Sequence, residues 1–155
     1  MRYWLFKSEP SSYSWQKLQK DGRTAWSGVR NFQARNNMME MKVGDLGFFY
    51  HSSIAIPEIA GIVKVVREAY PDSTAWEKGG EYYDPRSTQK KPMWFMVDVA
   101  PEGDLPQPIT LPAMRAEPVL EYMALLKRGQ RLSVQPVTPQ EWKAILALGR
   151  RPPRA

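Results

Sequence analysis

Short runs of aromatic and β-branched residues recur along the chain, separated by segments rich in Pro, Gly, Ser and Asp. Such runs are typical of strands, whereas apolar residues three or four apart are typical of helices. Strands with helices inserted between them predict one mixed α+β domain built on a small curled sheet or barrel. The predicted strands are residues 3–7, 46–53, 56–70, 93–99 and 131–137, and the predicted helices are residues 12–19, 30–39, 112–116 and 118–126.

The last helix has the sharpest local signal. Thr138-Pro139-Gln140-Glu141 is a capping box, with Thr as the N-cap, Pro at the first helical position and Glu three residues after the cap. The spacing of Trp142, Ile145 and Leu146 predicts an apolar face that packs into the core. Gly149 is predicted to end the helix as its C-cap.

Nothing in the composition divides the 155 residues into two units, and this length is usual for one domain. We expect a single domain over residues 1–149, followed by a basic, Pro-rich and disordered tail at residues 150–155. The Pro-rich stretch at residues 101–112 is predicted to be a connection between a strand and a helix.

The composition excludes several kinds of site. The chain has no cysteine and a single histidine, His51. Disulfides, iron–sulfur clusters, Cys-ligated zinc and multi-His metal sites are therefore excluded, and we expect no metal and no cofactor. No apolar run approaches the roughly 20 residues of a membrane span, and the first residues lack the features of a signal peptide. We expect a cytoplasmic protein that does not enter the membrane.

Charge and aromatic content point to a polyanionic partner. The formal net charge is +6, aromatic residues make up 12% of the chain, and the excess of positive charge lies in residues 1–50 and 101–155. A basic surface attracts nucleic acid, and aromatic side chains stack on bases. The same numbers also arise in small domains that use Trp in the core, so composition leaves both interpretations open.

The segment from Trp26 to Asn36 gathers polar side chains suited to nucleic acid. The amide of Asn31 has both donor and acceptor atoms, as reading a base edge requires. It lies near the predicted start of a helix, where free N–H groups favour anions. Arg30 and Arg35 are suited to phosphate. The alternative is a polar surface helix with Trp26 as a core side chain. The residues alone favour neither the nucleic-acid site nor the surface helix.

Three residues at the end of a predicted strand form a second candidate. As a general base, His51 would need a nucleophile such as Ser52, but neighbours on a strand point to opposite faces. Catalysis by His51 is therefore not expected. Tyr50 and Ser52 point the same way, which allows both to line a pocket.

Further candidates lie in the second half of the chain. Trp94 is predicted either to stack on a ring or to fill the core. Ser133 and Gln135 are two residues apart on the last predicted strand and are expected to point to one side. Four acidic residues share one loop, but their spacing matches no metal-binding loop, so we expect them to be solvated. They are Asp72, Glu77, Glu81 and Asp84.

Five motifs, in their order along the chain, resemble the EVE domain. The resemblance extends from Tyr3 to about Leu148. It implies a PUA-like fold, which is a curled β-barrel with short helices around it. It also implies recognition of a modified base, in particular a modified cytosine, in DNA or RNA. The motifs are WSGVRNFQARN, FFYHSS, GIVKVVREAYPD, YYDPRS and RLSVQPVTPQEW.

The resemblance further implies a pocket of aromatic and polar side chains from several segments. Many relatives have an acidic residue at the position of Ser27. Because a carboxylate accepts from an exocyclic amine whereas Ser is a smaller donor and acceptor, Ser27 leaves the base preference open. The implied ligand-binding residues are Trp26, Ser27, Asn31, Tyr50, His51, Ser52, Trp94, Ser133 and Gln135, with phosphate contacts from Arg30 and Arg35.

We hypothesise a monomeric, non-catalytic reader. An extruded or unpaired base would be stacked by Trp26 or Trp94, and its edge would be read by Asn31, Ser52 and Gln135. The alternatives are an enzyme acting on a small anionic or nucleoside-like ligand in the same pocket and a protein-interaction module. Binding that depends on salt and on base modification would favour the reader, and turnover of a free nucleoside would favour the enzyme.

Overall fold

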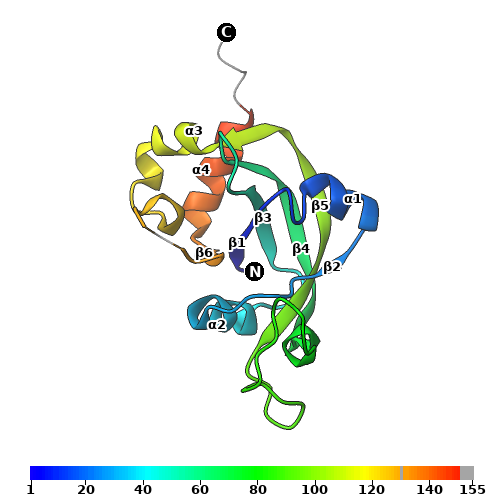
Figure 1. Cartoon of the computed structure of the whole chain (residues 1–155). Helices are drawn as coiled ribbons and strands as arrows, with labels where there is room; N and C mark the ends of the chain where they lie inside the picture. Colours follow the sequence, from blue (N-terminus) through cyan, green and yellow to red (C-terminus); the bar gives the residue numbers. More distant parts are fainter. Residues whose placement is uncertain (130, 151–155) are drawn as a thin grey trace.

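The aromatic and β-branched runs form six strands of one curved sheet in the computed structural model, which describes residues 1–129 and 131–150 (Figure 1). The strand order is β2-β5-β4-β3-β1-β6, and β1 pairs with β3 in parallel while the other neighbours are antiparallel. The predicted α+β class is confirmed. The strands are β1 (Tyr3–Ser8), β2 (Thr24–Ala25), β3 (Leu46–His51), β4 (Glu58–Pro71), β5 (Phe95–Thr110) and β6 (Val134–Val137).

The prediction of a connection at residues 101–112 is wrong, because β5 continues through this stretch to Thr110. β5 pairs with β4 on one side, as far as the pair of Glu58 and Thr110. On its other side, β2 covers only Asp98 and Val99. The prolines after residue 100 therefore lie where one edge of β5 faces no strand, and an edge tolerates residues without an N–H donor.

Within residues 1–129 and 131–150, four helices and three short 3₁₀ turns surround the sheet. The segment predicted as a helix at residues 118–126 forms two separate 3₁₀ turns instead. The first helix begins later than predicted, because the Ser14 side chain accepts from the Lys17 N–H at 3.0 Å and so caps it. The helices are α1 (Trp15–Asp21), α2 (Phe32–Glu40), α3 (Leu111–Arg115) and α4 (Pro139–Arg150), and the 3₁₀ turns are Ser73–Trp76, Pro118–Leu120 and Ala124–Leu126.

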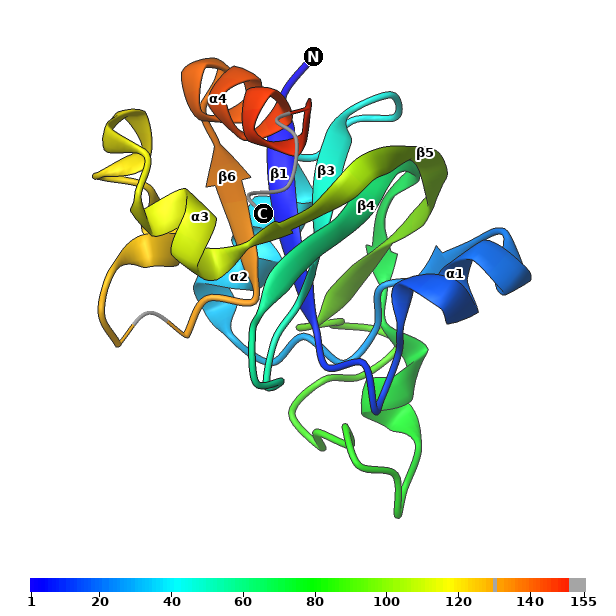
Figure 2. The same ribbon diagram turned by 90° about the horizontal axis from the view of Figure 1, so that it is seen from above.

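Successive strand residues alternate between two apolar clusters, as the two faces of a sheet require. Leu5 and Phe48 belong to one cluster, together with buried residues of α3 and α4. Phe6 and Phe49 belong to the other, which we call the α1–α2 cluster because Leu18, from α1, and Met38, from α2, are part of it. In Figures 1 and 2, α3 and α4 lie together and α1 lies apart from them.

The capping box at the start of α4 is confirmed. The Thr138 N–H donates to Glu141 Oε1 at 2.9 Å, and the Glu141 N–H donates to Thr138 Oγ1 at 3.1 Å. Ile145 is fully buried, as predicted. Gly149 is not the C-cap, since α4 extends to Arg150; it is a point of close approach, where a Cβ would lie 3.2 Å from Ile109 Cδ1.

We expect Thr138→Ala to lower the free energy of unfolding by about 1 kcal/mol, the usual loss when an N-cap side chain is removed. Chemical denaturation measures this change. Gln140→Ala is the matched control, because Gln140 is exposed in the same turn and Gln and Ala have similar helix propensities. Equal stabilities for the two variants would contradict a capping role for Thr138.

Most of the predicted tail, residues 151–155, lies outside the described residues, so its disorder stays a prediction. Arg150 is the last residue of α4. Within the described ranges, no helix combines the length and the apolar character needed to cross a bilayer.

Candidate functional site

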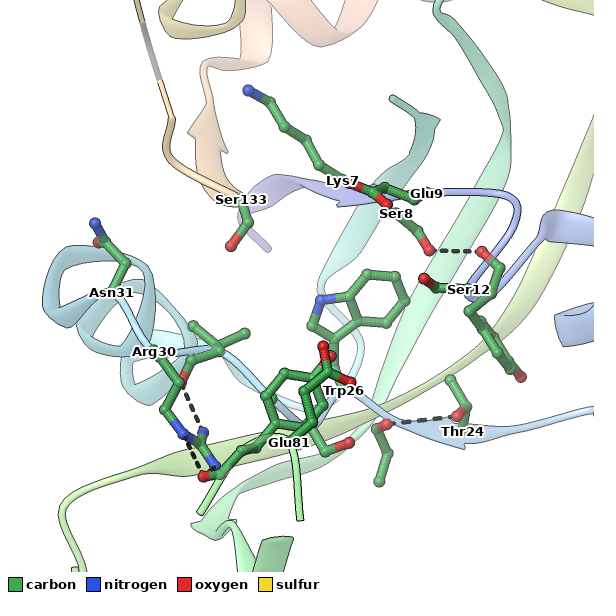
Figure 3. A pocket seen from close by; sticks show the side chains of 16 residues that line it. Lys7, Ser8, Glu9, Ser12, Thr24, Trp26, Arg30, Asn31, Glu81 and Ser133 are labelled. Atoms are coloured by element: carbon green, nitrogen blue, oxygen red, sulfur yellow. Dashed lines mark hydrogen bonds between the residues drawn. The ribbon is translucent and has the colours of Figure 1, made fainter. Parts of the chain in front are cut away.

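A pocket of about 630 Å³ opens where four segments of the chain meet (Figure 3). This volume is within the range of about 300–1,000 Å³ that is usual for ligand sites. The segments are the end of β1 with the loop after it, the stretch from β2 to the start of α2, the Glu81–Tyr82 loop, and Ser133 before β6. The lining residues are Lys7, Ser8, Glu9, Ser12, Tyr13, Thr24, Ala25, Trp26, Ser27, Gly28, Val29, Arg30, Asn31, Glu81, Tyr82 and Ser133.

Trp26 is both a core side chain and a wall of the pocket. Its N–H donates to the Val97 carbonyl at 2.7 Å, which fixes it beside β5. Its ring meets Phe6 and Phe49 edge-on, with centroids 5.1 and 5.6 Å apart, and only 9% of the residue is exposed. Trp26 therefore belongs to the core and to the pocket lining at once.

The turn after Trp26 requires glycine. Gly28 has φ +82, a backbone conformation that other residues rarely adopt. A Cβ at Gly28 would also lie 2.7 Å from the Tyr82 ring. Tyr82 therefore packs directly on this turn; it is 39% exposed and lines the pocket together with Trp26 and Tyr13.

Asp72 joins the turn at Gly28 to the 3₁₀ turn Ser73–Trp76. It is completely buried and accepts from the Gly28 N–H at 2.8 Å, from Arg30 Nη1 at 3.1 Å and from the Thr74 N–H at 2.9 Å. Burial acts to raise the pKa of Asp72, but the hydrogen bond from the Thr74 hydroxyl at 2.6 Å, together with the bonds just described, outweighs it, so the pKa is lowered. The expectation of a solvated loop acid is wrong for Asp72.

Arg30 holds the pocket together instead of facing outward. Besides Asp72, its guanidinium donates to the Tyr82 carbonyl at 2.8 Å and to Thr74 Oγ1 at 3.2 Å. Arg35 lies outside the pocket lining and donates to the Met93 carbonyl at 2.9 Å and to its neighbour Asn36. Both guanidinium groups are thus engaged within the protein, and their predicted contact with phosphate stays a prediction.

Asn31 is the N-cap of α2. Its Oδ1 accepts from the Ala34 N–H at 2.9 Å. The residue is exposed and lines the pocket. The amide oxygen is thus used by the fold, whereas the amide NH₂ has no hydrogen-bond partner among the described residues and can donate to a ligand. The sequence predicted that Asn31 lies near the start of a helix. Its capping hydrogen bond, and with it the contribution of Asn31 to stability, is seen only in the structure.

Comparison with known proteins identifies the family of the chain. The sequence matches the EVE domain over residues 2–148. The chain belongs to the EVE domain family. Human thymocyte nuclear protein 1 is 41% identical over 170 residues, which cover 97% of this chain and 75% of the relative. The resemblance seen in the sequence is confirmed.

Solved structures of EVE domain relatives have the same fold. The human THYN1 protein in complex with DNA containing 5-methylcytosine superposes with a TM-score of 0.94 at 39% identity, covering 99% of this chain and 100% of that one. A Pseudomonas putida protein gives a TM-score of 0.91 at 46% identity, covering 95% and 99%. An ASCH protein from Zymomonas mobilis, at 11% identity and a TM-score of 0.52, shares the fold alone.

The strand that ends at His51 does not line the pocket of this EVE domain. His51 is buried and its Nε2 accepts from the Trp15 N–H at 3.0 Å, so it supports the start of α1, and burial lowers its pKa. Tyr50 is buried in the cluster on the α3–α4 side, away from Trp26. Ser52 is also absent from the lining. The prediction that these three residues build the pocket is corrected.

Trp94 is a core residue at the base of the loop it follows. It is 2% exposed, its Nε1 donates to Asp84 Oδ2 at 2.8 Å, and Phe32 stacks on it with ring centroids 4.8 Å apart. Hydrogen bonds hold the pKa of Asp84 well below its usual range; the bond from the Arg86 side chain has the largest effect, followed by the bond from Trp94. Neither Trp94 nor Asp84 lines the pocket, so Trp94 is not available there to stack on a base.

Of the pair on the last strand, only Ser133 reaches the pocket. Gln135 is fully buried, and its amide donates to the Leu132 carbonyl at 2.8 Å. Ser133 lies just before β6, outside the regular strand, and its carbonyl accepts from the Lys7 N–H at 2.8 Å. The expectation that both side chains face the same site is wrong, because the alternation rule does not extend past the strand end.

Sequence reasoning missed Lys7, Tyr82 and the pocket role of Glu81. Glu81 is exposed, and Lys7 is half-buried with its pKa lowered by burial. In the part of the chain that the structure describes, neither charged group has an ion-pair partner. A charged residue in the aromatic run YWLFK was the available signal for Lys7.

Proposed function

We propose that this EVE domain is a non-catalytic module that binds DNA and takes a modified cytosine, such as 5-methylcytosine, into the pocket beside Trp26. The observation that carries the proposal is a pocket with an aromatic wall in a chain that superposes over 99% of its length on the human THYN1 protein solved with 5-methylcytosine-containing DNA. An extruded base costs a few kcal/mol in lost stacking, and stacking on protein aromatics returns about 1–3 kcal/mol.

The lining offers groups suited to a cytosine. Trp26 and Tyr82 provide two aromatic rings. The Glu81 carboxylate is an acceptor for an exocyclic amine, the group that distinguishes cytosine from thymine. Glu81 thus supplies the carboxylate that Ser27 does not. Asn31 and Ser133 add a donor and a hydroxyl at the other side of Trp26 (Figure 3).

A binding assay with defined oligonucleotides tests the proposal. Labelled DNA strands that carry one 5-methylcytosine or one cytosine are titrated with the protein, single-stranded and as duplexes, beside RNA strands of the same sequence. We expect at least about fourfold tighter binding of the methylated DNA, since burying a methyl group is worth roughly 0.8 kcal/mol. Equal affinities for the two bases, or turnover of the free nucleoside, would refute a non-catalytic reader.

Asn31 is expected to act on both stability and binding. Asn31→Ala should lower the free energy of unfolding by about 1 kcal/mol through loss of the cap, and should reduce the preference for the modified base. Asn31→Asp is the matched variant, because Asp caps equally well but lacks the NH₂ donor. Denaturation and titration of both variants separate the two roles. Wild-type binding by Asn31→Asp would show that the NH₂ group does not contact the base.

Lys7 is expected to replace Arg30 and Arg35 as the phosphate contact. In Figure 3 its side chain points away from Trp26, on the side of the pocket where Ser133 lies, and we place the strand backbone there. Lys7→Gln should weaken methylated and unmethylated DNA equally and reduce the slope of log affinity against log salt by about 0.7–0.9. Lys143→Gln, at an exposed position of α4, is the charge-matched control. An unchanged slope for Lys7→Gln would contradict this assignment.

A further inference from the structure

The connection between β3 and β4 forms a protruding tip that carries two exposed isoleucines. Residues 53–56 are all exposed, and Ile54 and Ile56 have 36% and 58% of their surface accessible. The tip has no charged side chain between His51 and Glu58. Two β-branched apolar side chains, two residues apart on one narrow tip, make a firm apolar edge instead of the polar turn that is usual there.

The tip is fixed to the rim of the pocket. The Ser52 N–H donates to the Ser8 carbonyl at 2.9 Å, and the Ser53 hydroxyl donates to Glu9 Oε1 at 3.2 Å. Ser8 and Glu9 both line the pocket. Ser53 holds a left-handed conformation with φ 59, which reverses the chain just before Ile54.

The other end of the tip is also held. The Pro57 carbonyl accepts from the Leu111 N–H at 2.8 Å, and β4 begins at the next residue, Glu58. The isoleucines are therefore presented by a short segment bound at both ends. Such a segment does not need to be ordered when it meets a partner, which keeps the entropic cost of binding low.

We propose that Ile54 and Ile56 form a wedge that enters a DNA duplex next to the base that the pocket takes up, a role that rests on the proposed function. Extrusion of a base leaves a gap in the stack, and apolar side chains such as Ile are known to insert between base steps and hold them apart. The wedge lowers the cost of opening a duplex. It adds nothing for a single strand, whose bases are already accessible.

Measurements on duplex and single-stranded DNA test the wedge. The protein with Ile54→Ser and Ile56→Ser is titrated with a duplex that contains one 5-methylcytosine and with the same strand alone. The control carries Val119→Ser and Tyr122→Ser, at positions that are 46% and 82% exposed and outside the pocket lining. A 2-aminopurine placed beside the methylated cytosine reports local unstacking.

We expect the wedge variant to bind the duplex about tenfold more weakly, to bind the single strand within about twofold of wild type, and to lose the 2-aminopurine signal on the duplex. The control variant should match wild type on both probes. Unchanged duplex binding, or an equal loss on both probes, would overturn the wedge while leaving base recognition intact. A wild-type protein that binds neither probe would overturn the proposed function and the wedge together.

Discussion

Replacing Asp72 by alanine is expected to lower the free energy of unfolding by about 3–5 kcal/mol, the range for removing one partner of a buried ion pair. The change would leave the Gly28 N–H and part of the Arg30 guanidinium without the acceptor they now share. It would also release the Trp26–Gly28 turn from the 3₁₀ turn Ser73–Trp76, which contains Thr74. We therefore expect DNA binding to be lost along with stability.

The same carboxylate predicts how stability depends on pH. Because the pKa of Asp72 is lower in the folded protein than in the unfolded chain, its contribution is complete above the unfolded pKa of about 3.9 and is lost as the pH falls through the folded value. Denaturation at pH 7 and at acidic pH should show a smaller acid-induced loss for Asp72→Ala than for wild type. Glu102→Ala, at an exposed position of β5, is the charge-matched control and should change neither quantity. Equal acid sensitivity of Asp72→Ala and wild type would contradict the assignment.

Features encoded by neighbouring residues were predictable from the sequence. The capping box at Thr138 and the strand at Tyr3–Ser8 depend on side chains within one turn or one alternating run, so their signals are complete in a short window. The strand predicted at residues 93–99 ended too early, because proline locally disfavours a strand, whereas β5 runs to Thr110. Proline is tolerated in β5 because one edge of this strand lacks a neighbouring strand there. Which edge is free depends on the whole sheet.

The pocket was only partly predictable, because it is assembled from segments far apart in the chain. Arg30 has the right chemistry for phosphate, but its partner Asp72 lies 42 residues away and is buried by the fold. Trp94 and Trp26 are alike in sequence terms. Only packing shows that Phe32 covers the first while the second borders the pocket. Glu81 was recognised as a loop acid, and its position opposite the Trp26 segment came from the tertiary structure.

Replacing Trp26 by leucine is expected to weaken DNA binding by about 5- to 150-fold, which corresponds to the roughly 1–3 kcal/mol of one base–aromatic stack. Because Trp26 also packs against Phe6 and Phe49, the variant should be less stable as well. Trp→Ala typically lowers the free energy of unfolding by about 3–5 kcal/mol, and leucine, which is larger than alanine, should lower it by less. A loss of binding alone would therefore not separate stacking from unfolding.

Trp15→Leu provides the separation. Trp15 is 5% exposed, belongs to the same α1–α2 cluster and packs on Phe49 with ring centroids 5.6 Å apart, but it does not line the pocket. Both variants should be destabilised to a similar extent in denaturant, whereas only Trp26→Leu should lose affinity when the folded proteins are titrated with 5-methylcytosine DNA at low temperature. If the two variants lost affinity equally, the effect would follow stability, and Trp26 would be a core side chain that does not stack on the base.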